Sequence, residues 1–181
     1  MISIGLVEVT SIARGVEVAD TMLKAGSVEL AFAKPVCPGK FIILVHGDVG
    51  AVESAVHDGL DIGAGAVVNH LVIPRVHPSL IPAVNAVLPA PPAGALGVAE
   101  FFDIASAVVG ADAAAKAGRI ELVEVRLGVG IGGKSFVKLC GDVADVRAAV
   151  AASLEAAARR GAVVASCVIP SPDPALFREL L

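Results

Sequence analysis

The chain has 181 residues, of which 56% are hydrophobic, and a net charge of −4 at pH 7. The negative charge and the absence of Trp and Tyr argue against nucleic-acid binding, which needs basic patches for phosphates and aromatic platforms for bases. The longest uncharged run, 76–99, is interrupted by prolines and predicts no membrane span, so the apolar surplus predicts burial between subunits.

The first part of the chain alternates between strand-like and helix-like patterns. Strands are predicted where apolar residues alternate or run together, at Ser3–Val9, Val28–Ala33, Phe41–Val45 and Ala66–Ile73. Helices are predicted where apolar residues recur at helical spacing, from Ile12 to Leu23 and from Val49 to Leu60. Gly26 is placed to end the first helix, and Asp48 to cap the start of the second. This β-α-β-β-α-β order predicts a ferredoxin-like α+β fold.

The same pattern then starts again. Leu96-Gly97-Val98-Ala99-Glu100 repeats Ile4-Gly5-Leu6-Val7-Glu8 at an offset of 92 (97 − 5). The offset grows to 94 at the hairpin loop and to 96 beyond the second helix, which are places where a duplicated domain tolerates insertions. We therefore predict two tandem domains, 1–80 and 95–181, joined by a proline-rich linker at 81–94.

A cysteine lies in the loop between the two predicted hairpin strands. Pro38 and Gly39 are turn formers, so they place the thiol of Cys37 at the tip of the hairpin. A structural cysteine is usually found inside a strand or helix. One thiolate is too few to hold a metal cluster, but several copies could converge on a symmetry axis. A solvent-facing thiol without a cofactor, a single metal ion and a cluster all remain open.

The corresponding loop of the second repeat is rich in glycine. Residues 128–135 match the P-loop pattern of nucleotide-binding proteins letter for letter. A P-loop must open a helix whose N-terminal amides hold the phosphates, whereas Phe136–Cys140 predicts a strand. We therefore interpret this segment as a glycine-rich loop without specific affinity for nucleotides.

The remaining polar groups give little support to an enzyme. Cys140 and Cys167 fall in predicted strands, where core or half-buried packing is expected. His57 lies in a predicted helix, and His77 follows the first repeat at a predicted interface. The sequence contains no Ser/His/Asp arrangement, paired-carboxylate motif or Cys-x-x-Cys spacing. We therefore expect a protein without catalytic activity.

Several motifs of the first repeat resemble those of bacterial microcompartment shell domains. They are Gly5-Leu6-Val7-Glu8, the run from Ala19 to Lys24, the run from Gly47 to Val52, and Val72-Ile73-Pro74-Arg75. Two such domains in unpermuted order resemble a tandem-domain shell protein. The loop Val36-Cys37-Pro38-Gly39-Lys40 is similar to the pore loop of the iron–sulfur-bearing type from propanediol-utilisation compartments.

The resemblance implies a homotrimer that imitates a hexagonal tile, a pseudohexamer of shell domains around a central pore. It implies that the pore is lined by two loops, with residues Lys34, Pro35, Val36, Cys37, Pro38, Gly39, Gly128, Val129, Gly130, Ile131, Gly132 and Gly133. Lys24 and Arg75 occupy positions that lie along tile edges in the family, where tiles join other shell proteins. Lys116 matches Lys24 in the second repeat, but Ser171 replaces the arginine.

The resemblance also implies a cofactor at Cys37. One [4Fe–4S] cluster per trimer would take a Cys37 thiolate from each chain, leaving one iron to water or a small ligand. Such a cluster would pass electrons across the shell, with enclosed redox enzymes as partners, or store clusters for repair. A rival hypothesis is a trimeric ferredoxin-like regulator that senses a metabolite and binds no cluster.

The cysteine count and the N-terminus bear on location. Three cysteines are an odd number, which favours a reducing compartment over a disulfide framework. No basic segment precedes a hydrophobic stretch at the N-terminus, so no secretory signal is expected. We therefore predict a cytoplasmic protein located in a microcompartment shell.

Overall fold

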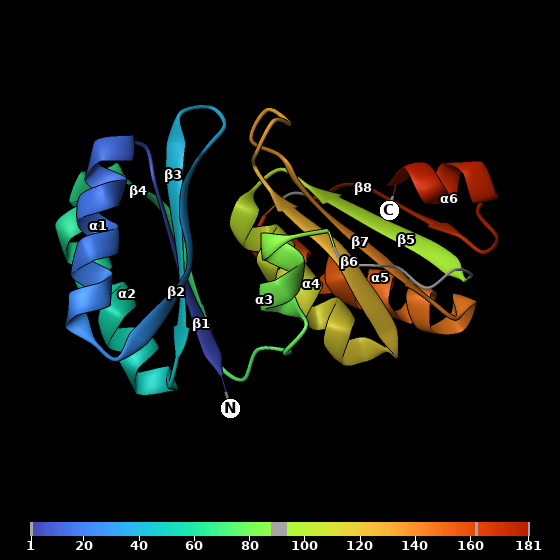
Figure 1. Cartoon of the computed structure of the whole chain (residues 1–181), viewed down its shortest axis with the longest axis horizontal. Helices are drawn as coiled ribbons and strands as arrows, with labels where there is room; N and C mark the ends of the chain where they lie inside the picture. The colour runs from blue at the N-terminus through green and yellow to red at the C-terminus, as the bar shows by residue number, and fades with distance from the viewer. Residues whose placement is uncertain (1, 88–93, 162, 181) are drawn as a thin grey trace. The chain divides into compact units, whose positions relative to one another are not determined.

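The computed structural model describes residues 2–87, 94–161 and 163–180. The chain divides into two compact units, Met1–Val76 and His77–Leu181. Each unit contains one four-stranded antiparallel sheet with two long helices (Figure 1).

The first unit follows the predicted β-α-β-β-α-β order. Its elements are β1 (Ser3–Val9), α1 (Ile12–Ala25), β2 (Val28–Val36), β3 (Lys40–Gly47), α2 (Val49–Gly63), the short 3-10 turn η1 (Ala64–Ala66) and β4 (Val67–Ile73). The strand order across the sheet is β2-β3-β1-β4, so β2 and β4 form its edges. The side chain of Ser11 caps α1 by accepting a hydrogen bond from the Arg14 N–H.

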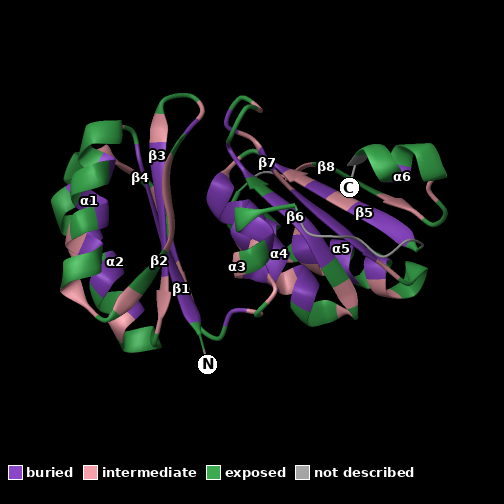
Figure 2. Cartoon of the chain, viewed as in Figure 1, coloured by how far each residue is buried: buried purple, intermediate pink, exposed green. Residues whose placement is uncertain are grey.

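The core of the first unit lies between the sheet and its two helices. Alternate residues of the central strands, such as Val7 and Val45, point toward α1 and α2 and are fully buried. A Cβ at position 5 would lie 2.5 Å from a methyl carbon of Val56, so this position has room only for glycine. The glycine therefore lets α2 pack directly on β1. Figure 2 shows the buried residues concentrated on these central strands.

The second unit repeats this arrangement. Its elements are α3 (Leu80–Asn85), β5 (Ala95–Phe101), α4 (Ile104–Ala117), β6 (Ile120–Leu127), β7 (Ser135–Gly141), α5 (Val143–Ala158), β8 (Val163–Ile169) and α6 (Pro174–Leu180). The strand order is β6-β7-β5-β8. Gly97 plays the part of Gly5, since a Cβ there would lie 2.9 Å from methyl carbons of Val146 and Val150 on α5.

The two sheets share their register and their irregularities. Gly5 pairs with Val45 in the first sheet, and Gly97 pairs with Leu139 in the second. A register shift interrupts β2 between Leu30 and Phe32, and the same shift interrupts β6 between Leu122 and Glu124. The internal repeat seen in the sequence is therefore a repeat of structure down to its β-bulges.

The predicted fold class is confirmed in both units, with three differences in detail. Strand β2 continues past Ala33 to Val36, because an edge strand tolerates Pro35, which has no N–H to donate. The segment 81–94, predicted as a linker, begins inside α3, and its residues 88–93 lie outside the described part. α6 was not predicted. None of the helices in the described ranges combines the length and apolarity needed to cross a lipid bilayer.

Candidate functional site

The hairpin between β2 and β3 carries Cys37 at its tip. The Gly39 N–H donates to the carbonyl oxygen of Val36 at 3.0 Å and closes the turn. Gly39 has a φ of +87°, a left-handed conformation that favours glycine. The Cys37 side chain is half-buried, and its neighbour Pro38 is exposed. The thiol is therefore held at an accessible end of the hairpin, as predicted.

Two lysines flank this thiol along the chain and are held by different contacts. Lys40 Nζ forms an ion pair with Oε1 of Glu8, a β1 side chain that is fully buried. Losing one member of a buried pair is strongly destabilising, so this contact ties the base of the hairpin to β1. Lys34 Nζ lies 4.4 Å from the centroid of the Phe32 ring, and burial lowers the pKa of Lys34. The Cys37 loop thus has cationic residues at both ends.

The second loop, between β6 and β7, is built from backbone hydrogen bonds and left-handed glycines. The Gly128 N–H donates to the Lys134 carbonyl oxygen at 3.1 Å, and Gly130, Gly132 and Gly133 all have positive φ. Lys134 Nζ pairs with Glu100 at 2.5 Å, in the same way that Lys40 pairs with Glu8. The loop leads into β7 and not into a helix, so it lacks the helix N-terminus of a P-loop.

The other two cysteines differ from Cys37 in exposure. Cys140 lies fully buried in β7, packed with Leu96, Val123 and Phe177, and burial raises its pKa to about 11. Cys167 is exposed on β8, so the prediction of core or half-buried packing is wrong for this residue. The physical reason is that Cys167 pairs with Val98 on the face of the sheet opposite α4 and α5, and the side chain stays uncovered on this face of edge strand β8.

One chain does not assemble a metal site from its described residues alone. Within the described part of one chain, no three His, Cys, Asp or Glu side chains gather where they could hold a metal ion. Cys37 offers one accessible thiol on a loop, and iron–sulfur clusters are held by cysteine thiolates. Lys40 is already paired with Glu8, and Lys34 lies over the Phe32 ring, so the thiol itself is the donor that this loop offers. One chain therefore supplies a single accessible thiol here, and a cluster bound at Cys37 requires thiols from further chains.

The residues predicted at tile edges lie at the ends of elements. Lys24, in the last turn of α1, pairs with Asp20 at 2.6 Å. Lys116, in the last turn of α4, pairs with Asp112 at 2.5 Å. Arg75 is exposed just after β4 and has a positive φ of 54°, which is uncommon for a residue other than glycine. Their role at edges stays a prediction.

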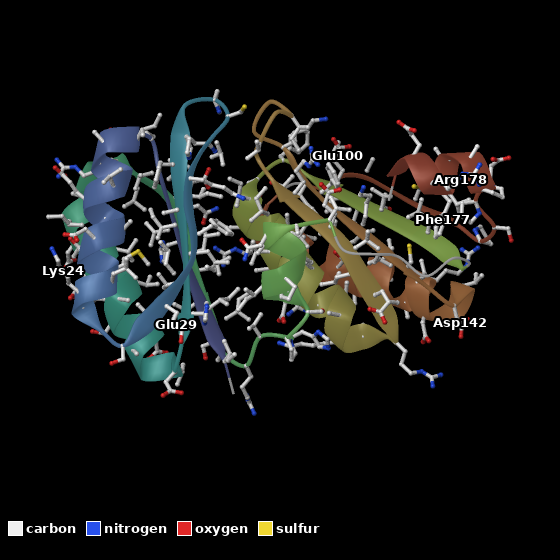
Figure 3. The ribbon with its side chains drawn as sticks, viewed as in Figure 1. Lys24, Glu29, Glu100, Asp142, Phe177 and Arg178 are labelled. Atoms are coloured by element: carbon white, nitrogen blue, oxygen red, sulfur yellow. The ribbon has the colours of Figure 1, made fainter. Side chains whose placement is uncertain are left out.

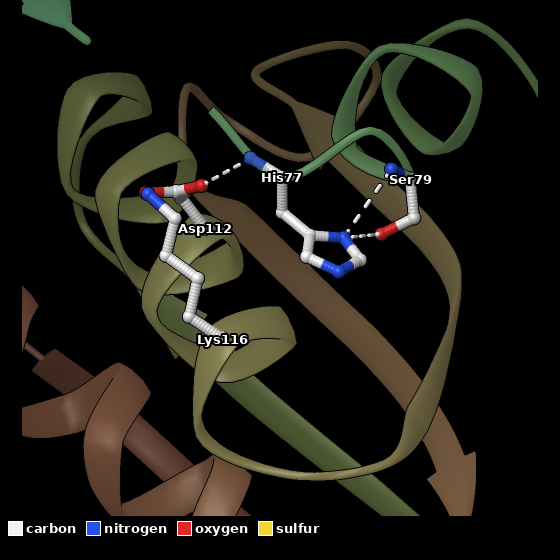
Figure 4. A network of polar contacts seen from close by, with 4 residues as sticks. All are labelled: His77, Ser79, Asp112 and Lys116. Atoms are coloured by element: carbon white, nitrogen blue, oxygen red, sulfur yellow. Dashed lines mark hydrogen bonds and ion pairs between the residues drawn. The ribbon is translucent and has the colours of Figure 1, made fainter. Parts of the chain in front are cut away.

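One polar network was not predicted. The His77 N–H donates to Asp112 at 2.8 Å, and the His77 ring nitrogen Nδ1 lies 2.7 Å from the Ser79 hydroxyl (Figure 4). The same Asp112 carboxylate pairs with Lys116, so the start of α3 is anchored to α4. The sequence does show that the Asp20–Lys24 pair recurs as Asp112–Lys116 at an offset of 92. It does not show that Asp112 is buried while Asp20 is exposed.

Comparisons with known proteins agree over most of the chain. The family model of the BMC domain matches twice, at residues 3–76 and 95–172. The bacterial microcompartment shell protein PduT of Citrobacter freundii is 39% identical over 179 residues, which cover 99% of this chain and 97% of PduT. The carboxysome shell protein CcmK2 of Synechococcus elongatus is 35% identical over 83 residues, covering 44% of this chain and 81% of CcmK2.

Solved structures give the same result. A microcompartment protein from Desulfitobacterium hafniense superimposes with a TM-score of 0.93 at 54% identity, covering 98% of this chain and 99% of that one. A fused permuted hexameric shell protein from the RMM microcompartment superimposes with a TM-score of 0.64 at 25% identity, covering 87% of this chain and 84% of that one.

Proposed function

This chain belongs to the BMC domain family of bacterial microcompartment shell proteins, and on that premise we propose that three copies form one tile of a shell. The observation that carries the proposal is the duplication, since two BMC domains of the same fold lie in one chain. Three chains then supply a pseudohexameric ring of domains. Neighbouring shell proteins join it edge to edge, through the ends of α1 and β4 that carry Lys24 and Arg75.

In such a tile, the two hairpin loops would line a central opening. They occupy equivalent places, one between β2 and β3 and the other between β6 and β7. Both are tied to the first strand of their sheet by a Lys–Glu pair. The loops therefore hold equivalent positions with different chemistry, a thiol in one and a run of glycines in the other.

We further propose that the tile holds one [4Fe–4S] cluster through Cys37 of each chain. The support is the position of Cys37, which is accessible at a hairpin tip with lysines on either side. A bound cluster supplies one-electron redox chemistry. The Cys37 thiolates of the three chains would hold it. The cluster would connect enclosed redox enzymes with the outside, or serve as a store for cluster repair.

Iron analysis of anaerobically purified protein tests the cluster. About four irons per three chains are expected at full loading, because one shared site serves the whole tile. Cys37→Ser should abolish iron binding, whereas Cys167→Ser, which also changes a solvent-accessible thiol, should leave it unchanged. Wild-type protein that binds no more iron than Cys37→Ser after anaerobic reconstitution with iron and sulfide would overturn this assignment.

Assembly tests the shell role separately. Light scattering after size exclusion should give about three times the mass of the 18.1 kDa chain, and concentrated protein should form sheets visible by electron microscopy. A discrete trimer that never forms sheets and binds a metabolite tightly would favour a sensor. A stable monomer at micromolar concentration would contradict the tile.

A further inference from the structure

The tip of the Cys37 hairpin projects beyond the strand that supports it. The last pair between β1 and β3 is Val9 with Phe41. Strands β2 and β3 stay paired one step further, at Val36 and Lys40. The thiol therefore lies at the end of a segment that is only two strands wide. Two paired strands alone are marginally stable in water, so such a hairpin end needs side-chain contacts to keep a fixed direction.

A buried ion pair supplies such a contact. Glu8 pairs with Ile42 across the β1–β3 register, and Lys40 precedes Ile42 by two residues, so Glu8 and Lys40 are diagonal neighbours on one face of the sheet. Their side chains form an ion pair, in which the Glu8 side chain is 1% exposed and the Lys40 side chain is 21% exposed. Lys40 therefore holds the closing pair of the hairpin to a carboxylate that water hardly reaches.

The restraint reaches the thiol through a short turn. Only Cys37, Pro38 and Gly39 connect Val36 to Lys40. The Gly39 N–H donates to the Val36 carbonyl oxygen at 3.0 Å, and the ring of Pro38 fixes its own φ. With so little freedom in the turn, a displacement of Lys40 displaces the thiol as well.

The second unit contains the same pair in a more open form. Glu100 pairs with Phe136 across the β5–β7 register, and Lys134 precedes Phe136 by two residues. Glu100, labelled in Figure 3, forms an ion pair with Lys134 at 2.5 Å, and the two side chains are 32% and 42% exposed. The loop here spans 128–134, against 37–39 in the first unit, and all four of its glycines have positive φ. The pair is thus buried beside the loop with the thiol and open beside the loop without one.

We propose that Glu8 and Lys40 are positioning residues for Cys37, which fix the thiol of each chain in the place that a shared cluster requires. The inference rests on the proposed cluster, for which thiols from three chains must meet around one group. The residues around such a site must hold its ligands to within about 0.5 Å. A buried ion pair resists displacement, because separating it leaves an uncompensated buried charge. The exposed pair of Lys134 with Glu100 restrains its loop much less.

Iron retention tests the positioning. In anaerobically reconstituted protein, Glu8→Gln should weaken the retention of iron against a chelator by about ten- to a hundredfold, as the loss of a residue that orients a metal ligand commonly does. Lys40→Arg keeps the cation and should retain iron nearly as well as the wild type. Glu100→Gln is the matched control, since it removes the same charge beside the loop that has no cysteine. It should retain iron as the wild type does.

Alkylation of iron-free protein measures the position of the thiol without a cluster. The reaction of Cys37 with iodoacetamide is followed in a Cys167→Ser background, which removes the other thiol that is not buried. Glu8→Gln should make Cys37 react severalfold faster, because the half-buried thiol is then free to leave its cover. Glu100→Gln should leave the rate unchanged.

A double variant, Glu8→Gln with Lys40→Met, separates positioning from stability. It leaves no unpaired buried ion, so its thermal stability should return toward that of the wild type, and it carries the test if Glu8→Gln alone does not fold. Its iron retention should nevertheless stay low, because the ion pair no longer fixes the hairpin end.

The outcomes distinguish this inference from the cluster itself. A double variant that retains iron as the wild type does, or a Glu100→Gln variant that loses iron as readily as Glu8→Gln, would overturn the positioning role and leave the cluster in place. Wild-type protein that binds no more iron than Cys37→Ser would instead refute the cluster. Equal alkylation rates in the wild type and Glu8→Gln would then overturn the positioning of the thiol as well.

Discussion

Cys140 should make the stability of the protein depend on pH in the alkaline range. Its thiol is fully buried in β7, and burial raises the pKa from 9.0 to about 11, with Lys138 acting weakly in the opposite direction. Between these pH values the unfolded chain gains a thiolate while the folded protein keeps the thiol neutral. The stabilising contribution is therefore fully present below pH 9.0 and is lost as the pH rises toward about 11.

The size of the effect follows from the shift. One unit of pKa corresponds to about 1.36 kcal/mol, so Cys140 accounts for a loss of up to about 2.7 kcal/mol in the free energy of unfolding across this range. Cys140→Ala should remove this part of the pH dependence, although the variant is less stable at every pH. Cys167→Ala is the control, because this exposed thiol should leave the pH dependence as it is in the wild type.

Urea unfolding followed by far-ultraviolet circular dichroism measures the effect, since the chain has no Trp or Tyr for fluorescence. Curves at equal protein concentration, from about pH 8 to about pH 11, give the difference between wild type and variant at each pH. The ultraviolet absorbance of the thiolate follows the titration of the cysteines directly, because the chain has no Tyr whose phenolate would absorb as well. If wild type and Cys140→Ala lose stability in parallel as the pH rises, the reasoning about this thiol is refuted.

Three further predictions concern packing, edges and the glycine loop. Gly15→Ala should lower the free energy of unfolding by about 1–3 kcal/mol, because the new Cβ would lie 2.5 Å from a ring carbon of Phe41 on β3. Gly50→Ala is the control in thermal melts and should be neutral or stabilising, because the space around Gly50 is open. Lys24→Ala combined with Arg75→Ala should abolish sheets under the electron microscope and leave the trimer intact by light scattering; unchanged sheets would refute the edge assignment. Lys134→Ala should leave calorimetric titrations with ATP and Mg²⁺ as featureless as those of the wild type, and micromolar binding lost in the variant would contradict the interpretation of this loop.

The duplicated fold could be predicted because its signals are local and occur twice. Gly5 and Gly97 mark the same close approach of a helix to a strand, and each lies in a run of alternating apolar residues. The turn chemistry of Pro38 and Gly39 is also a local signal, and it places Cys37 on a loop. Strand β7, after the glycine-rich loop, could be predicted both from its own composition and from its place in the repeat.

The contacts of α3 and α6 could not be predicted. Both are short helices with little intrinsic stability, so packing against other elements decides whether they form. Pro82 inside α3 and the prolines after it favoured a linker over a helix. The exposure of Cys167 and the burial of Asp112 also depend on which elements pack over these residues. The alternation of apolar and polar residues in the sequence does not show which elements those are.

The difference between the two hairpin loops has a consequence for evolution. A ring assembled from identical single domains must repeat every loop mutation around its axis, so a cysteine gained once appears on every loop. Covalent duplication separates the loops genetically. In this chain one loop carries Cys37 while the other became a glycine-rich turn with a different length. Selection can then adjust the thiol-bearing loop and the glycine-rich loop through separate codons, without changing the sheets on which both loops stand.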